Sequence, residues 1–111
     1  MELRRDVFQA IADPTRRGII DLLSNQSLNL NTVAGHFDMS RPAVSKHIRI
    51  LTECGLIIIK QEGRDRYCRT DVQKLKEVDQ WLNRYRKFWI RKLDALGEFL
   101  ERPDNQDESK Q

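Results

Sequence analysis

Apolar residues recur three or four positions apart along the first part of the chain, which is the pattern of amphipathic helices. This pattern predicts a first helix over residues 3–11 and a second that begins at Asp13-Pro14. Asp13 can accept hydrogen bonds from free backbone amides, and Pro14 suits the first turn because its missing N–H costs nothing there. The expected apolar sides consist of Leu3, Val7, Phe8, Ile11, Ile19, Ile20, Leu22 and Leu23.

Two more helices are expected next, at the spacing of a helix-turn-helix. The shorter is capped by Asn29 or Asn31 and runs through Phe37, and the longer is capped by Ser40. Their apolar sides consist of Val33, Ala34, Phe37, Val44, Ile48 and Leu51. The other side of the longer helix carries Arg41, Ser45, Lys46 and Arg49. Because such side chains bond base edges and phosphates, we interpret this side as a DNA-reading surface.

A β-hairpin is predicted over residues 56–70. Gly55 supplies a left-handed stop for the preceding helix, and the β-branched run over residues 56–59 favours a strand. Turn residues at 63–65 lead into a strand that returns antiparallel. Arg64 and Arg66 lie at the tip, where they can reach the minor groove or a phosphate, although Arg66 can also point inward.

Residues 72–100 contain no proline and predict one long helix. Its apolar stripe consists of Leu75, Val78, Leu82, Tyr85, Trp89, Leu93, Leu96 and Leu100, widened by Trp81, Phe88 and Phe99. So small a domain cannot bury this surface alone, and a second copy is the expected cover. The predicted dimer interface consists of Val7, Phe8, Leu82, Tyr85, Trp89, Leu93 and Leu96. The aromatic residues could instead line a ligand pocket between subunits.

The chain has 111 residues, enough for one domain with a modest core. Its net charge is +3, but residues 39–70 carry seven basic against three acidic side chains, so positive charge concentrates at the expected reading surface. We expect a winged helix-turn-helix domain over 1–100 and a polar, acidic, disordered tail over 101–111. Neither a signal peptide nor a membrane span is indicated, which favours a cytoplasmic protein.

The two cysteines, Cys54 and Cys68, cannot form a disulfide framework, and we expect both to be reduced. Their spacing from His36 and His47 matches no compact ligand motif, so no metal or cofactor is predicted. A redox- or ligand-responsive regulator that uses the two cysteines stays open as an alternative. Neither a nucleophile arrangement nor a glycine-rich phosphate loop is recognisable in the sequence, which argues against an enzyme.

The predicted order is helix, helix, helix-turn-helix, two-stranded wing and long terminal helix, a mainly α fold with a small β-hairpin (α+β). This order resembles the winged-helix repressors of the ArsR type (ArsR/SmtB). The segments that carry the resemblance are ADPTRRGIIDLL (12–23), SRPAVSKHIRILTECGLI (40–57), EGRDRYCR (62–69) and FWIRKLDAL (88–96). The resemblance implies a homodimer, held by the first and last helices, that places two recognition helices in successive major grooves of a pseudo-palindromic operator.

The sequence departs from this pattern in two places. Many helix-turn-helix units have glycine where this chain has Asp38, which predicts a strained, left-handed turn. Metal-sensing members carry Cys-x-Cys, or Asp and His ligands, where this chain reads SLNLNTVAGHF and DVQKLKEVDQWLNRY. The chain therefore resembles the branch that lacks the metal-ligand motifs.

We predict a sequence-specific, homodimeric DNA-binding transcriptional regulator, a repressor, with double-stranded DNA as its partner and no enzymatic activity. The predicted DNA-binding residues are Arg41, Ser45, Lys46, His47, Arg49, Arg64 and Arg66. His47 borders the apolar stripe and has two interpretations, a packed side chain and a phosphate contact. Arg16 and Arg17 are left out because an ion pair with Asp21 is the simpler role. The alternative is a protein-interaction module whose DNA binding is vestigial.

Overall fold

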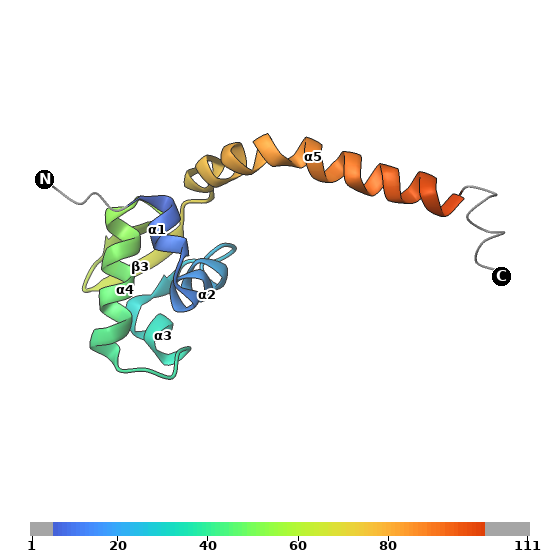
Figure 1. Ribbon diagram of the computed structural model, residues 1–111. Helices are drawn as coiled ribbons and strands as arrows, with labels where there is room; N and C mark the ends of the chain where they lie inside the picture. Colours follow the sequence, from blue (N-terminus) through green and yellow to red (C-terminus); the bar gives the residue numbers. More distant parts are fainter. Residues whose placement is uncertain (1–5, 102–111) are drawn as a thin grey trace, which may run out of the picture. The chain divides into compact units, whose positions relative to one another are not determined.

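The computed structural model describes residues 6–101. Leu3, which was predicted to lie on the apolar side of the first helix, is outside this range, as are residues 102–111 of the predicted tail. Its contacts divide the chain into two units that meet between Val78 and Asp79. The elements are α1 (Val7–Ile11), α2 (Pro14–Leu22), β1 (Leu28–Asn29), α3 (Leu30–Gly35), α4 (Arg41–Glu53), β2 (Ile57–Glu62), β3 (Asp65–Thr70), η1 (Val72–Leu75) and α5 (Lys76–Glu101). Helices α2 and α3 both pack against α4 (Figure 1).

Side-chain caps fix where the first helices begin. The Asp13 carboxylate accepts from the Arg16 backbone N–H at 2.9 Å, and the Ser40 hydroxyl accepts from Ala43 at 3.3 Å, which confirms both predicted caps. Of the two candidates for α3, Asn29 is the cap. The α1 cap, Asp6, exchanges hydrogen bonds with Gln9 in a capping box that the sequence analysis missed.

The sheet has three antiparallel strands in the order β1-β3-β2, so the predicted two-stranded hairpin is correct but incomplete. The hairpin pairs Ile57 with Thr70 and closes at Glu62 and Asp65, around Gly63, whose φ is 63°. The additional strand, β1, is two residues long and was not predicted, because two residues carry no readable period.

The core lies where α1, α2, α3 and α4 meet the sheet. It is formed by Val7, Ala10, Ile19, Ile20, Leu23, Val33, Val44, Ile48, Leu51, Cys54, Leu56, Ile57 and Cys68. Among the described residues, Thr70 is the one buried polar residue of this core region. Its hydroxyl donates to the Ile20 carbonyl at 2.9 Å and its N–H to the Leu23 carbonyl at 3.0 Å, which ties β3 to the end of α2.

The turn between α3 and α4 differs from the prediction. Helix α3 ends at Gly35, two residues before the expected end at Phe37. No residue other than glycine has a positive φ among residues 6–101, so Asp38 does not adopt the left-handed conformation and the expected strain is absent. Gly55 does adopt it, with φ 79°, and ends α4 as predicted.

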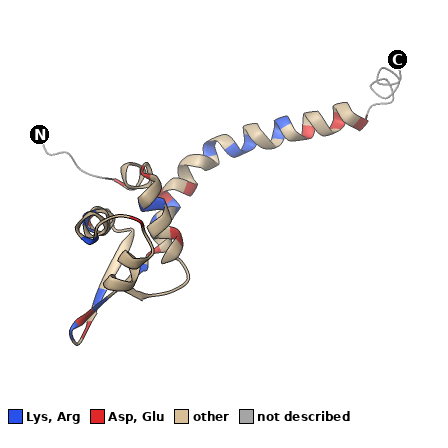
Figure 2. Cartoon of the chain, turned by 90° about the horizontal axis from the view of Figure 1, so that it is seen from below, with Lys and Arg blue, Asp and Glu red and all other residues tan. Residues whose placement is uncertain are grey.

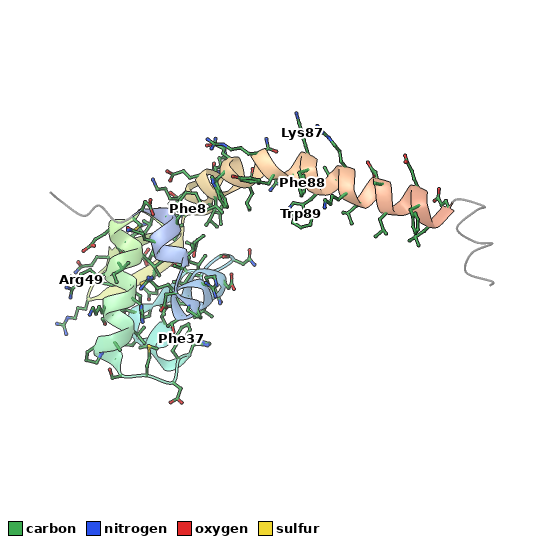
Figure 3. The ribbon with its side chains drawn as sticks, in the orientation of Figure 1. Phe8, Phe37, Arg49, Lys87, Phe88 and Trp89 are labelled. Atoms are coloured by element: carbon green, nitrogen blue, oxygen red, sulfur yellow. The ribbon has the colours of Figure 1, made fainter. Side chains whose placement is uncertain are left out.

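The long C-terminal helix is present, although its first turn, η1, is a 3₁₀ helix. Ten large apolar side chains of α5 are exposed, which are Trp81, Leu82, Tyr85, Phe88, Trp89, Ile90, Leu93, Leu96, Phe99 and Leu100. In the second unit, Trp89 and Lys87 extend from different sides of this helix (Figure 3). No helix of the described chain has the length and apolar character that crossing a membrane requires.

Candidate nucleic-acid interface

Helix α4 presents a basic side to solvent because its opposite side is fixed in the core. Val44, Ile48 and Leu51 are buried at 0%, 2% and 0% exposure. At 100° per residue, Lys46 and Arg49 fall on the other side of the helix from these three, and both are exposed. Figure 3 shows Arg49 on the outer side of α4. These two cations are therefore free to approach an anionic surface.

Among the other predicted residues of α4, Ser45 and His47 are less accessible than Arg41. Arg41, the first residue of the helix, is exposed, whereas Ser45 is half-buried. His47 is also half-buried, with 21% of its side chain exposed. Its Nδ1 lies 3.3 Å from an Arg16 nitrogen and 3.9 Å from the Asp13 carboxylate. The structure therefore places His47 against α2. This position agrees with the first of the two interpretations, a packed side chain.

The tip of the β2–β3 hairpin carries a second group of charged residues (Figure 2). Arg64 and Arg66 are both exposed, so the option that Arg66 points inward is wrong. In antiparallel register the tip closes between Glu62 and Asp65, and Arg66 lies opposite Gln61.

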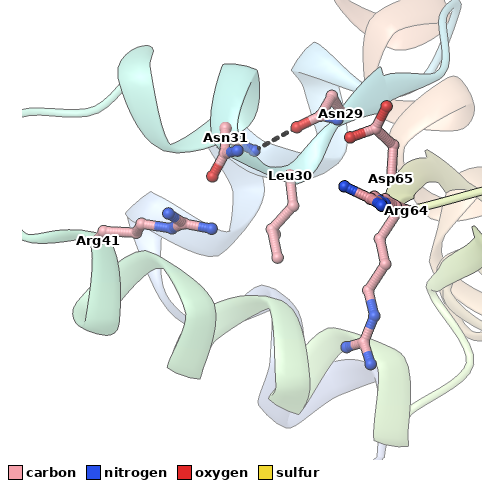
Figure 4. Close-up of a pocket in the computed structure, with 7 residues that line it drawn as sticks. Asn29, Leu30, Asn31, Arg41, Arg64 and Asp65 are labelled. Atoms are coloured by element: carbon pink, nitrogen blue, oxygen red, sulfur yellow. Dashed lines mark hydrogen bonds between the residues drawn. The ribbon is translucent and has the colours of Figure 1, made fainter.

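A polar hollow of about 140 Å³ joins this tip to the start of α4 (Figure 4). It is lined by Asn29, Leu30, Asn31, Arg41, Arg64, Asp65 and Arg66. Three arginines against one aspartate make the lining cationic, and the asparagines add neutral polar groups. The two asparagines of this lining were not predicted from the sequence, because only the pairing of β1 with β3 brings residue 29 beside the hairpin, opposite Tyr67.

Arg16 and Arg17 are bound within the fold through backbone carbonyls rather than through the predicted pair with Asp21. Arg17 donates to the Ile11 carbonyl at 2.8 Å. Arg16 donates from Nε to the Ala10 carbonyl at 2.7 Å and from a terminal nitrogen to the Gln9 carbonyl at 3.1 Å. Both arginines thus donate to carbonyls at the end of α1, where a helix has few backbone donors of its own left.

The residues predicted to form a dimer interface divide into two groups. Val7 is only 2% exposed, and the prediction for it does not fit, because a side chain packed in its own core has no surface left for a second copy. Phe8 is 39% exposed on α1. The α5 members Leu82, Tyr85, Trp89, Leu93 and Leu96 are all exposed, Leu93 most at 65%.

Cys54 and Cys68 are buried and form no disulfide within the described chain. Burial raises the pKa of the Cys68 thiol, which disfavours the reactive thiolate. The Cys54 thiol lies 3.5 Å from the Asp6 carbonyl, which accepts its hydrogen bond. Within residues 6–101, no three His, Cys, Asp or Glu side chains are grouped as a metal site requires.

Comparison with known proteins gives consistent results. The family model described as "Bacterial regulatory protein, arsR family" matches residues 13–58, which run from the cap of α2 into β2. The transcriptional repressor SdpR of Bacillus subtilis is 35% identical over 69% of this chain and 86% of its own length. The HTH-type transcriptional regulator Rv2034 of Mycobacterium tuberculosis is 32% identical over 85% of each chain.

Solved structures resemble the fold as well. A crystal structure of an ArsR family transcriptional regulator matches with a TM-score of 0.66 and 36% identity, over 74% of this chain and 84% of that one. The homodimeric winged helix-turn-helix DNA-binding domain of Mb0332 from Mycobacterium bovis matches with a TM-score of 0.58 and 27% identity, over 71% of this chain and 76% of that domain.

Proposed function

The chain belongs to the ArsR family of bacterial regulatory proteins, and on this basis we propose that it is a homodimeric repressor that binds a pseudo-palindromic operator. Members of the family are regulators rather than enzymes. The proposed partner is double-stranded DNA, and the proposed place of action is the cytoplasm. We further propose that residues 1–100 act as one winged helix-turn-helix domain with terminal dimerisation helices, and that residues 101–111 form a tail.

The observation that carries this proposal is the two-sided character of α4. Its apolar side is buried, so the helix is held in one orientation while Lys46 and Arg49 stay exposed. An α-helix fits the major groove of B-DNA, where arginine and lysine bond guanine edges and phosphates. Arg41 and Ser45 flank this pair on the same helix. We therefore assign base reading to the exposed side of α4.

The polar hollow supports a second contact. A sugar-phosphate strand separates the major groove from the minor groove, so it must pass between a helix in the first and a wing in the second. The hollow lies between the start of α4 and the hairpin tip and is lined by Arg41, Arg64 and Arg66. We propose that a backbone phosphate of that strand binds there, with Asn31 as a neutral neighbour.

The proposed dimer supplies the second half of the reader. Exposed apolar residues form a stripe along α5. Contact of this stripe with water is unfavourable, and packing against the α5 of a second copy would remove the stripe from water. The solved Mb0332 domain is itself a homodimer. Two copies related by a two-fold axis would present two α4 helices to half-sites about 34 Å apart, one helical turn of DNA.

Binding to duplex DNA tests the proposal. The probe is a labelled fragment from upstream of the protein's own gene, refined by selection from genomic fragments. We expect saturable binding that Arg49→Ala and Lys46→Ala weaken. A lost base contact costs about 1 to 3 kcal/mol, or roughly tenfold to hundredfold in affinity, whereas a lost phosphate contact mainly lowers the salt dependence.

Lys87→Ala is the matched control, because it removes the same charge from an exposed position of α5. We expect this variant to bind like the wild-type protein. If all three variants bind equally well, the assigned reading surface is wrong. If the wild-type protein selects no sequence and shows no salt-dependent binding, the protein-interaction module becomes the better account.

A further inference from the structure

Arg16 connects three helices through one guanidinium group. Its Nε and one terminal nitrogen bind the Ala10 and Gln9 carbonyls, which belong to the last residues of α1. Its other terminal nitrogen lies 3.3 Å from Nδ1 of His47, in the middle of α4. Arg16 itself is in the first turn of α2. Its side chain thus joins α1 directly to the helix that we propose as the reader.

The chemistry of this contact requires one tautomer of the neutral histidine ring. A guanidinium group has only donors, so Nδ1 of the neutral His47 ring is the acceptor of this hydrogen bond and the ring proton lies on Nε2. The Asp13 carboxylate is 3.9 Å from Nδ1, too far for a hydrogen bond, and it already accepts from the Arg16 backbone N–H. Arg16 is therefore the group that orients the ring in the described structure.

A second contact joins the same two helices at the C-terminal end of α4. The thiol of Cys54, the residue that ends α4, donates to the carbonyl of Asp6, the residue that caps α1. A thiol is a weak donor, so this hydrogen bond adds little to the apolar packing that holds α4 in the core. The charged, three-pronged contact of Arg16 is the stronger of the two.

We propose that Arg16 is a positioning residue for DNA binding, which sets the orientation of α4 against α1 by way of His47. This inference rests on the proposed function. Arg16 does not contact DNA in this account, and His47 serves as its attachment point on α4. The contact also links the reader to the helix that carries Phe8, a proposed dimer residue.

Arg16→Met tests the proposal because it keeps the apolar stem and removes every donor. We expect operator affinity to fall about tenfold, the value of the one charge-assisted hydrogen bond that reaches α4, at His47. Arg17→Met is the matched control. Arg17 also donates to a carbonyl of α1, at Ile11, but has no hydrogen bond to His47. Its substitution therefore removes a contact to α1 and leaves the contact to α4 in place. We expect the operator affinity of this variant to stay within about twofold of wild type.

Substitutions of His47 separate positioning from direct DNA contact. Asparagine puts an amide near the position of Nδ1, and glutamine puts one near that of Nε2. If Arg16 acts through Nδ1, His47→Asn retains most of the wild-type affinity and His47→Gln loses about as much as Arg16→Met. The opposite order, with glutamine active and asparagine inactive, would show that His47 contacts phosphate through Nε2 and would overturn the proposal.

A readout without DNA keeps this inference separate from the proposed function. Nitrogen-15 NMR of the neutral His47 ring should show the proton on Nε2 in the wild-type protein and in Arg17→Met. In Arg16→Met both tautomers should be populated. A ring that is insensitive to Arg16→Met, together with unchanged operator affinity, refutes the proposal. A wild-type protein that binds no DNA but keeps the Nε2 tautomer refutes only the proposed function.

Discussion

At the scale of single residues, Asp13 shows how a side chain at a helix start makes stability depend on pH. The Arg16 backbone N–H, which donates to its carboxylate, lowers the pKa of Asp13 below the usual 3.8, and the nearby positive charge of Arg16 acts in the same direction. Burial opposes them. The folded protein therefore prefers the ionised cap.

The consequence is measurable with Asp13→Asn. Asparagine caps helices about as well as aspartate but carries no charge, so the comparison isolates the ionised form. Because the folded pKa is lowered, the added stability of the wild-type protein is present above pH 3.8 and is lost as pH falls below it. Thermal unfolding of both proteins across this range should show their difference shrinking on acidification. A difference that stays constant with pH would contradict the assigned role.

The roles predicted correctly from the sequence belong to residues that interact with backbone groups close to them in the chain. Asp13, Ser40 and Gly55 act through backbone groups within a few positions, so their roles follow from residue type and neighbours. The contact between Arg16 and His47 joins residues 31 positions apart and has no such local signal. Only the packing of α2 on α4 brings the two side chains together.

At the scale of elements, long periodic segments were predicted and short ones were not. Helix α4 and helix α5 carry enough turns for the apolar spacing to be unambiguous. Strand β1 has two residues and depends on a partner, β3, that lies almost forty residues away in the sequence. Its position brings Asn29 to the edge of the hollow, and that part of the candidate site could not be predicted.

The turn before α4 was misjudged for a related reason. The strain expected at Asp38 rested on a glycine at the corresponding place in many helix-turn-helix units. Here α3 ends earlier, at Gly35, and His36 forms the cap in a right-handed conformation. The longer connection up to Ser40 can then turn without a left-handed residue, which is why aspartate is tolerated at position 38.

At the scale of the whole molecule, the account requires a dimer. Trp89 and Leu96 are 61% and 53% exposed on α5. Replacing both with glutamate adds charges to the proposed interface without opening the chain's own core, so helix content should persist while the dimer dissociates. Sedimentation equilibrium should report monomers for this double variant.

A single matched substitution controls for the added charge. Glu98 shows that α5 already accepts an exposed acidic residue, and Lys87 lies on a different side of the helix from Trp89 (Figure 3). Lys87→Glu should therefore leave the dimer intact. A double variant of Trp89 and Leu96 that still sediments as a dimer would show that the interface lies elsewhere.

If the exposed side of α4 reads DNA sequence, binding to duplex DNA depends on both sequence and salt. The measurement is the affinity of the wild-type dimer for its selected operator and for a scrambled duplex, between about 50 and 200 mM salt. We expect both affinities to fall steeply as salt rises. We also expect the affinity for the operator to stay about a thousandfold or more higher than that for the scrambled duplex. Equal affinities for the two duplexes, or a response that is flat in salt, would contradict this role of α4.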